Sequence, residues 1–271
     1  MLTPPATPHA LASPLARWLW WLPLLILLLG TPLWLHWWEP GMFLAINQWG
    51  APVAAEFWTG LSLLGNGWGV LGVTAPLLVL APRLMWGWLC AAPFAILFAR
   101  TGKFLIESPR PAAVVDNGQM RVVGELLHNV SMPSGHTLTA FAVAAGIFFA
   151  LTPALRRRHW WLWLAAAGCG LSRITVGAHW PGDVAVGASL GLLSGLLGHQ
   201  LWMRLPARHH QPTAWSLRLV AGLVALAVYH LLTEPLDFDE NQPAQLVLAA
   251  VATLSLLAFV WQTLRTQFQV K

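Results

Sequence analysis

Ionisable residues suited to chemistry gather in three short segments, at 103–111, 133–136 and 172–183. They supply cations, imidazoles and a carboxylate: Lys103, Arg110, Arg173, His136, His179 and Asp183. Several cations around one point repel a metal ion but attract an anion with many oxygens, such as a phosphate group. Imidazole can act as a nucleophile or carry a proton near neutral pH. The residue types therefore predict chemistry on a phosphate group.

The third segment places an imidazole beside the start of a helix. Proline is tolerated in the first turn of a helix, so Pro181 predicts a helix that begins there, with His179 just before it and Asp183 inside its first turn. A carboxylate near one ring nitrogen orients the imidazole and stabilises positive charge as the other nitrogen attacks phosphorus. We expect His179 to be the nucleophile and Asp183 to orient it.

The second segment, Pro-Ser-Gly-His at 133–136, predicts a second helix start. Ser134 is suited to cap that helix, and the free backbone N–H groups at Ser134 and Gly135 can bind an anion. His136 follows at once, in a position to protonate the leaving oxygen and later to activate water. Phosphate binding is assigned to the residues with suitable donors or charges: Lys103, Arg110, Ser134, Gly135 and Arg173.

Each of these residues also has an ordinary structural interpretation. The three cations can be interfacial residues whose charged ends reach the lipid headgroups, Ser134 a helix cap only, and either histidine a satisfied polar residue at a helix end. A metal site would draw on His136, His179 and Asp183 with Glu125 and His128. The surrounding cations disfavour a divalent ion, so we predict that the chain uses neither a metal nor another cofactor.

The spacing of these residues resembles that of the type-2 phosphatidic acid phosphatase superfamily, whose soluble relatives include bacterial acid phosphatases and vanadium haloperoxidases. The pattern is Lys, six residues, Arg-Pro; then Pro-Ser-Gly-His; then Ser-Arg, five residues, His, three residues, Asp, and this chain fits every position. The motifs span 103–183, and the six-span core would span about 18–203. The resemblance implies a helical bundle, a site at its outer end and a phosphohistidine intermediate.

The composition indicates a membrane protein. Hydrophobic residues make up 57% of the chain and charged residues only 9%, against about 25% charged residues in soluble domains. The net charge is +5, but the basic residues are scattered among apolar runs and form no stripe, so we expect no nucleic-acid partner. The expected partners are a lipid bilayer and a membrane lipid phosphate, and nothing in the sequence indicates an oligomeric state.

A helix needs about 20 apolar residues to cross a bilayer. The sequence offers eight such segments, near 18–38, 64–81, 84–104, 137–153, 159–177, 183–203, 216–233 and 244–264. Residues 42–62 are weakly apolar and carry Glu56, so they predict an interfacial or re-entrant segment. The stretch before Arg17 has no obvious cleavage site, and we interpret it with the first span as an uncleaved signal anchor.

Basic residues predict the orientation. With the N-terminus in the cytoplasm, alternating spans place ten Lys and Arg residues there: Arg17, Arg83, Arg156, Arg157, Arg158, Arg204, Arg208, Arg218, Arg265 and Lys271. The positive-inside rule favours this arrangement, which puts the C-terminus in the cytoplasm as well. All Asp and Glu residues then lie on the outer side with the three motif segments. We expect a multi-pass protein of the bacterial inner membrane whose site faces the periplasm.

The predicted fold class is therefore all-α and integral to the membrane, with a six-helix phosphatase core and two additional C-terminal spans at about 216–264. Residues 1–271 are expected to form one membrane phosphatase domain. Loop 112–132 is long for a helix connection and is either a lid or a passive interfacial segment.

The predicted function is hydrolysis of a phosphomonoester or diphosphate on a lipid. Undecaprenyl diphosphate, phosphatidylglycerol phosphate, phosphatidic acid and the phosphate of lipid A are all consistent with the family, and the residues do not select among them. A phosphotransferase would use the same intermediate with another lipid as acceptor. A non-enzymatic lipid transporter would instead carry charges and broken helices near the middle of the membrane, whereas the motif residues lie at span ends.

Overall fold

The computed structural model describes residues 15–211 and 213–269. The start of the predicted signal anchor and Lys271 lie outside the described residues. The N-terminal half contains η2 (Arg17–Trp21), α1 (Leu22–Leu29), α2 (Thr31–Trp34), α3 (Gly41–Trp49), α4 (Ala55–Ser62), η3 (Leu63–Gly65), α5 (Gly67–Thr74), α6 (Leu77–Leu80), α7 (Pro82–Leu89), α8 (Ala92–Leu105) and η4 (Pro111–Ala113).

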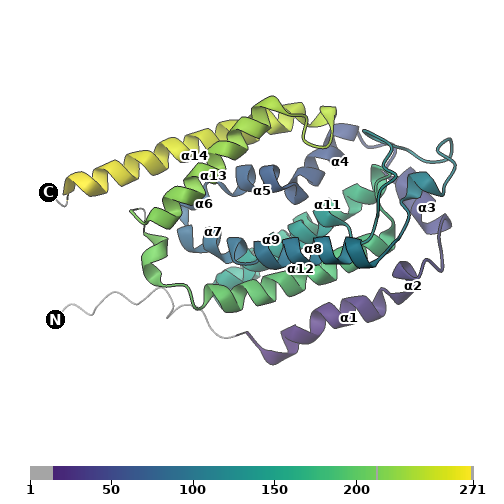
Figure 1. The fold of residues 1–271 in the computed structure, drawn as a ribbon, viewed down its shortest axis with the longest axis horizontal. Coiled ribbons are helices and arrows are strands. Elements are labelled where there is room, and N and C mark those ends of the chain that lie inside the picture. Colours follow the sequence, from purple (N-terminus) through teal and green to yellow (C-terminus); the bar gives the residue numbers. More distant parts are fainter. Residues whose placement is uncertain (1–14, 212, 270–271) are drawn as a thin grey trace.

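The C-terminal half contains α9 (Gly135–Ala150), α10 (Pro153–Arg158), α11 (Trp161–Thr175), α12 (Pro181–Trp202), η5 (Ala207–His210), α13 (Trp215–Thr233), η6 (Asp239–Asn241) and α14 (Gln242–Gln269). The described residues contain no strand, and the helices run roughly along one common direction (Figure 1). The predicted all-α membrane fold is confirmed.

Four helical stretches among the described residues are long and apolar enough to cross a membrane: Pro82–Leu105, Pro181–Trp202, Trp215–Thr233 and Asp239–Gln267. Arg17–Leu29 and Gly135–Ala150 are apolar but shorter. The predicted span at 64–81 is divided into α5 and α6 next to Pro76, and the span at 18–38 is interrupted at Gly30 and Pro32. Proline lacks the N–H that a continuous helix needs, which explains both interruptions.

Helix α12 is the centre of the bundle and packs most extensively against α9. Glycines on α12 allow this close approach. A Cβ atom at Gly191 would lie only 2.4 Å from the carbonyl oxygen of Leu138 on α9, and one at Gly187 would lie 2.8 Å from that of Ser134. Because α9 begins at the Pro-Ser-Gly-His segment and α12 begins beside His179, this packing fixes two of the three predicted motif segments relative to each other.

Helices α13 and α14 form a hairpin that packs on α5 and α6. Leu217, Val220 and Val224 of α13 are buried in one apolar cluster with Val70 and Leu78. The two additional spans predicted from the sequence therefore belong to the body of the bundle. The turn that joins them, residues 234–238, reaches the end of the bundle that carries the motif segments.

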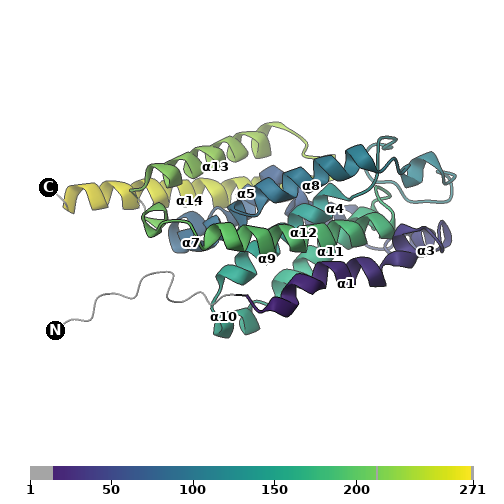
Figure 2. The same cartoon turned by 60° about the horizontal axis from the view of Figure 1, so that its bottom comes forward.

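Loops connect the helices at that end, and loop 112–132 is the longest of them (Figures 1 and 2). It is folded onto its neighbours. The Arg121 guanidinium donates to the carbonyl oxygens of Gly50, Ala51 and Val53, and the Val123 N–H donates to the Val176 carbonyl oxygen. Figure 2 shows α10, with its arginines, toward the opposite end of the bundle. The basic cluster and the motif segments thus occupy different ends.

Candidate active site

His179 and Asp183 form the buried centre of the candidate site. Helix α12 begins at Pro181, with Asp183 in its first turn, so the predicted helix start is confirmed. His179 Nδ1 lies 3.2 Å from Asp183 Oδ2. The same carboxylate oxygen accepts hydrogen bonds from the Trp180 backbone N–H and the Ser131 hydroxyl. Three donors therefore converge on one oxygen, which fixes the Asp183 side chain relative to the imidazole.

These partners assign the tautomer of His179. Its Nδ1 faces a carboxylate and must carry the proton, whereas its Nε2 lies 3.3 Å from Nη1 of Arg110, which is always a donor. The lone pair on Nε2 therefore points to the side of the ring that faces the cations. Burial, followed by the charges of Arg110, Arg173 and Lys103, holds the pKa of His179 well below its usual value of 6.5. A neutral imidazole is the nucleophilic form.

Arg110 is held by its surroundings. Its Nε donates to the Asn129 side-chain oxygen at 2.6 Å, and its Nη1 donates to the Ala178 carbonyl oxygen at 2.7 Å. Burial and the nearby charge of Arg173 lower the pKa of Arg110 to about 10, so the guanidinium remains charged at neutral pH. A fixed cation therefore lies directly against the candidate nucleophile.

Arg173 supplies a second buried cation from the last turn of α11. Its Nη1 donates to the Ser62 hydroxyl at 2.6 Å, and its guanidinium carbon lies 5.3 Å from the centre of the Phe238 ring. Its Nε is buried and has no hydrogen-bond partner among the described residues. A buried guanidinium donor without a partner fits a site whose anion would satisfy it. Lys103, in the last turn of α8, is half-buried, and its charge acts on His179 together with those of Arg110 and Arg173.

Ser134 and Gly135 begin α9 as predicted. Ser134 is the N-cap residue, and its hydroxyl accepts from the Thr137 backbone N–H and from the Thr137 hydroxyl. The hydroxyl is fully buried within this cap, so its predicted contact with phosphate remains a prediction. The space beside Gly135 is open, since a Cβ atom there would meet no atom within 4 Å. The predicted contact of the backbone N–H groups at this helix start with phosphate also remains a prediction.

His136 has a partner that the motif analysis did not include. Its Nε2 lies 3.0 Å from Oδ2 of Asp237, in the turn between α13 and α14. The same oxygen accepts from Asn66 Nδ2 at 2.7 Å. The His136 ring also acts electrostatically on His179, and Arg173 and Lys103 act on both rings. His136 and the three cations thus all lie within electrostatic range of His179.

Several other residues of the site were missed by the sequence analysis: Ser62, Asn129, Ser131, Asp237 and Phe238. Ser131 had a usable signal, because it lies just before the Pro-Ser-Gly-His segment. The others come from segments with no fixed spacing to any motif. Asp237 is one of several acidic residues in its turn, so charge alone did not single it out.

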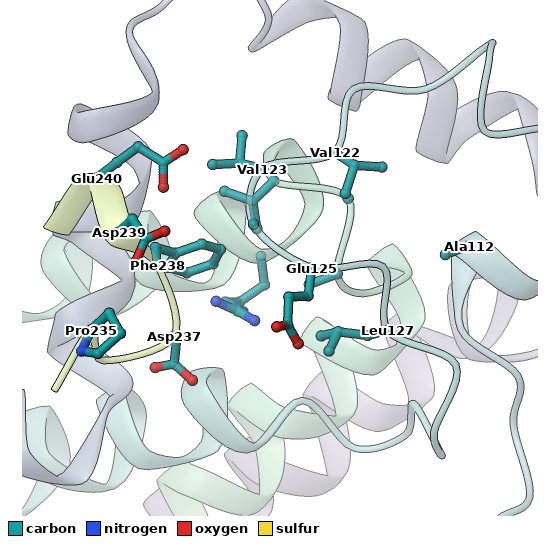
Figure 3. A pocket seen from close by; sticks show the side chains of 15 residues that line it. Ala112, Val122, Val123, Glu125, Leu127, Pro235, Asp237, Phe238, Asp239 and Glu240 are labelled. Atoms are coloured by element: carbon teal, nitrogen blue, oxygen red, sulfur yellow. The ribbon is translucent and has the colours of Figure 1, made fainter.

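A cavity of about 380 Å³ opens beside Arg173. Figure 3 shows Asp237 and Phe238 on one side of it and Glu125 and Leu127 of the long loop on the other. Loop 112–132 therefore forms a wall next to the site, as well as supplying Asn129 and Ser131 to it. Whether this loop moves as a lid stays a prediction.

A metal site would need several ligand side chains close together, and the structure describes residues 15–211 and 213–269. No three His, Cys, Asp or Glu side chains in these ranges lie close enough together to hold one metal ion. Metal-independent activity is still to be tested by chelation.

The lowered pKa of His179 predicts how the reaction depends on pH. The neutral ring is active, so the decrease of kcat/KM on the acidic side should follow this lowered pKa of His179, well below 6.5. Arg110→Gln removes one of the charges that lower the pKa of His179. The decrease of kcat/KM at acidic pH should therefore begin at a higher pH in this variant. The pH profiles of both proteins are measured with one substrate, so titration of the substrate phosphate cancels in the comparison. An unchanged limb in the variant would contradict the electrostatic explanation.

Residues 84–207 match the family model of the PAP2 superfamily. Two curated proteins are similar to parts of the chain. The "Bacitracin transport permease protein BcrC" of Bacillus licheniformis is 39% identical over 88 residues, and the "Lipid A 1-phosphatase" of Porphyromonas gingivalis is 43% identical over 95 residues. These alignments cover 32% and 33% of this chain, but only 40% and 19% of the relatives' own lengths.

Two crystal structures have a similar fold. LpxE of Aquifex aeolicus superposes with a TM-score of 0.52 at 26% identity, over 59% of this chain and 93% of that chain. The transmembrane PAP2 type phosphatidylglycerolphosphate phosphatase of Bacillus subtilis superposes with a TM-score of 0.50 at 22% identity, over 67% and 96%. The helical composition and these similarities identify a multi-span membrane protein.

Proposed function

Residues 84–207 belong to the PAP2 superfamily, and from this premise we propose that the chain is a membrane phosphatase that hydrolyses a lipid phosphomonoester or diphosphate through a phosphohistidine on His179. The observation that carries the proposal is the environment of His179. Its Nδ1 is held by Asp183 and its Nε2 faces the Arg110 guanidinium, so the nucleophilic lone pair points toward the cations that would bind a phosphate.

In the first step, Nε2 of His179 attacks phosphorus and the bond from phosphorus to the leaving oxygen breaks. Positive charge develops on the His179 ring, and the Asp183 carboxylate stabilises it through Nδ1. Arg110, Arg173 and Lys103 bind the non-bridging oxygens, whose charge persists throughout the transfer. His136 gives its proton to the leaving oxygen, which retains the electron pair of the broken bond.

In the second step, the phosphohistidine is hydrolysed. His136, now neutral, accepts a proton from water as the water oxygen bonds to phosphorus. The bond between phosphorus and His179 Nε2 breaks, and its electron pair returns to the ring. Orthophosphate leaves, and both histidines recover their starting states.

A lipid substrate is supported by the apolar surroundings of the site. A cavity of about 610 Å³ lies between the N-terminal helices and the segment after α8, and Leu35, Ile106 and Met132 are among its lining residues. Trp180, the neighbour of His179, also lines it and donates its indole N–H to the Pro109 carbonyl oxygen at 2.7 Å. The lining also includes His36, Glu39 and Glu107, but most of its surface is apolar and suits a lipid chain whose phosphate lies at the cations.

We place the site at the periplasmic face of a bacterial inner membrane, with both termini in the cytoplasm. The support is the distribution of charge, because Arg156, Arg157 and Arg158 lie toward the end of the bundle opposite the site and basic residues favour the cytoplasm. Candidate substrates are undecaprenyl diphosphate, phosphatidylglycerol phosphate, phosphatidic acid and the phosphate of lipid A. The last agrees with the name of one partial relative.

The direct test is orthophosphate release by the purified protein from these four lipids. We expect release from at least one of them, unchanged by EDTA and inhibited by vanadate. Vanadate adopts five-coordinate geometry and would occupy the site of the phosphate in transfer. Activity that disappears with EDTA and returns with a divalent metal would refute the metal-independent mechanism, whereas insensitivity to vanadate would argue against covalent transfer.

Product analysis separates the alternative functions. A phosphotransferase would place labelled phosphate on a second lipid instead of releasing it as orthophosphate. A transporter would move lipid between the leaflets of a vesicle without breaking its phosphate bond. Either result, in the absence of orthophosphate release, would replace the hydrolase proposal.

A further inference from the structure

The turn between α13 and α14 brings a carboxylate to the second histidine of the site. Asp237 Oδ2 lies 3.0 Å from His136 Nε2 and 2.7 Å from Asn66 Nδ2. Both Asp237 and Asn66 lie outside residues 84–207, which match the superfamily. The carboxylate that contacts His136, and the amide that contacts this carboxylate, therefore both come from outside the residues that match the superfamily model.

The turn is built to hold Asp237 in place. The backbone at Asp237 has φ 63°, a left-handed conformation that Asp tolerates better than most residues. Its neighbours Leu236 and Phe238 are both buried. Asn241 Nδ2 donates to the Leu236 carbonyl oxygen at 2.9 Å, and Gln245 Nε2 donates to that of Glu234 at 2.8 Å.

Phe238 joins the turn to the rest of the site. Its ring lies against the guanidinium of Arg173 and against Gly124, where a Cβ atom would approach the ring to 2.8 Å. Gly124 has φ +77° and so occupies a conformation that favours glycine. Asp237 is thus fixed between a buried leucine and a phenylalanine packed on a cation of the phosphate site.

The charges around His136 explain why a carboxylate matters there. Lys103 on α8 and Arg173 on α11 are positive, and the His179 ring gains positive charge during transfer. The Cys169 thiol contacts the His136 carbonyl oxygen. All of the charged neighbours except Asp237 oppose a second proton on His136, and that proton is the one a general acid must deliver.

Asp237 itself remains ionised. The side chain is only partly buried. This partial burial opposes ionisation, but hydrogen bonds from His136 and Asn66 and the charge of Arg173 hold the pKa of the Asp237 carboxyl well below its usual range. A permanent carboxylate accepts a hydrogen bond from Nε2–H of His136. This contact leaves Nδ1 as the ring nitrogen that is free to serve the leaving oxygen.

We propose that Asp237 is a positioning residue that orients His136 and favours its protonated form as the general acid, so that the α13–α14 hairpin completes the active site of the superfamily domain. This inference rests on the proposed phosphatase function. In the transfer step, His136 Nδ1 gives its proton to the leaving oxygen while Nε2–H stays bonded to Asp237. In the hydrolysis step, Nδ1 takes a proton from water, and Asp237 stabilises the positive ring again.

Leaving-group dependence distinguishes this role from a purely structural one. Two phosphomonoesters are compared, with the same long alkyl chain but with the phosphate on an aliphatic alcohol in one and on a nitrophenol in the other. The nitrophenolate leaves without protonation, whereas the alkoxide needs a general acid. We expect Asp237→Asn to reduce kcat/KM for the alkyl ester by about 10–100-fold, a part of the effect of a general acid, and that for the nitrophenyl ester by less than about threefold.

Two further variants complete the experiment. Asp237→Glu keeps the charge and should recover part of the alkyl-ester activity. Glu234→Gln changes an exposed carboxylate of the same turn, one that pairs with His230, and should behave as wild type. An equal decrease for both esters, or no decrease for either, would overturn the role of Asp237. If the wild-type protein released orthophosphate from neither of the two esters, the proposed phosphatase function itself would be overturned.

Discussion

Replacing His179 with alanine is expected to reduce orthophosphate release by at least about 10³-fold, because the variant has no nucleophile at the phosphate site. The protein should still insert into the membrane and fold. The His179 ring makes polar contacts with Arg110 and Asp183 and belongs to none of the main apolar clusters. The measurement is release from the best lipid substrate, with elution from a sizing column as the test of folding.

His128→Ala is the matched control for this variant. His128 lies in the long loop near the site but is exposed, and it was a candidate ligand only in the metal hypothesis. The control should retain wild-type activity. Brief reaction with a lipid labelled in its phosphate should also leave acid-labile label on the wild-type protein and none on His179→Ala. Residual activity of the variant within about tenfold of wild type would be incompatible with a nucleophilic His179.

Asp183→Asn is expected to have the next largest effect, a decrease in kcat of about 10²–10⁴-fold, since replacing the carboxylate that orients a catalytic histidine leaves a misoriented ring or the wrong tautomer. Asp183 Oδ2 accepts from Ser131 and Trp180 and faces Nδ1 of His179. The asparagine is nearly the same size and can retain one of these contacts, but it removes the charge that stabilises the ring. The loss should therefore be smaller than for His179→Ala, whose nucleophile is missing altogether.

Asp116→Asn serves as the control for this substitution. Asp116 is exposed in the long loop, where its carboxylate accepts a hydrogen bond from the Gly118 backbone N–H. Steady-state kinetics of the two variants on one lipid should separate them by at least about tenfold. Wild-type kcat in Asp183→Asn would show that the carboxylate does not assist His179.

The starts of the two site helices were predictable because they depend on neighbouring residues only. Ser134 caps α9 and Pro181 opens α12 through backbone chemistry that acts within one helical turn. The spacing of the third motif likewise puts Asp183 four residues after His179, within reach of its ring. The apolar composition likewise predicted a bundle of membrane helices. In lipid, a chain segment must satisfy its backbone N–H and C=O groups by hydrogen bonds within itself, and a helix does so.

Element lengths were less predictable. The interval 64–81 is mostly apolar, so hydropathy alone indicated one continuous span, yet the chain forms the separate helices α5 and α6 beside Pro76. Hydropathy measures the preference for lipid and does not register the loss of one backbone donor. The same limitation applies at Pro32, where the first predicted span is interrupted.

Only the tertiary structure determined the partners of the site residues. Asn129 holds Arg110 and Ser131 holds Asp183, both from a loop whose path depends on packing, such as the bonds from Arg121 to the segment after α3. Asp237 reaches His136 from the far end of the chain because the α13–α14 hairpin packs on α5 and α6. Motif spacing carries no information about such contacts, since they arise from the burial of apolar faces whose relative placement no local pattern encodes.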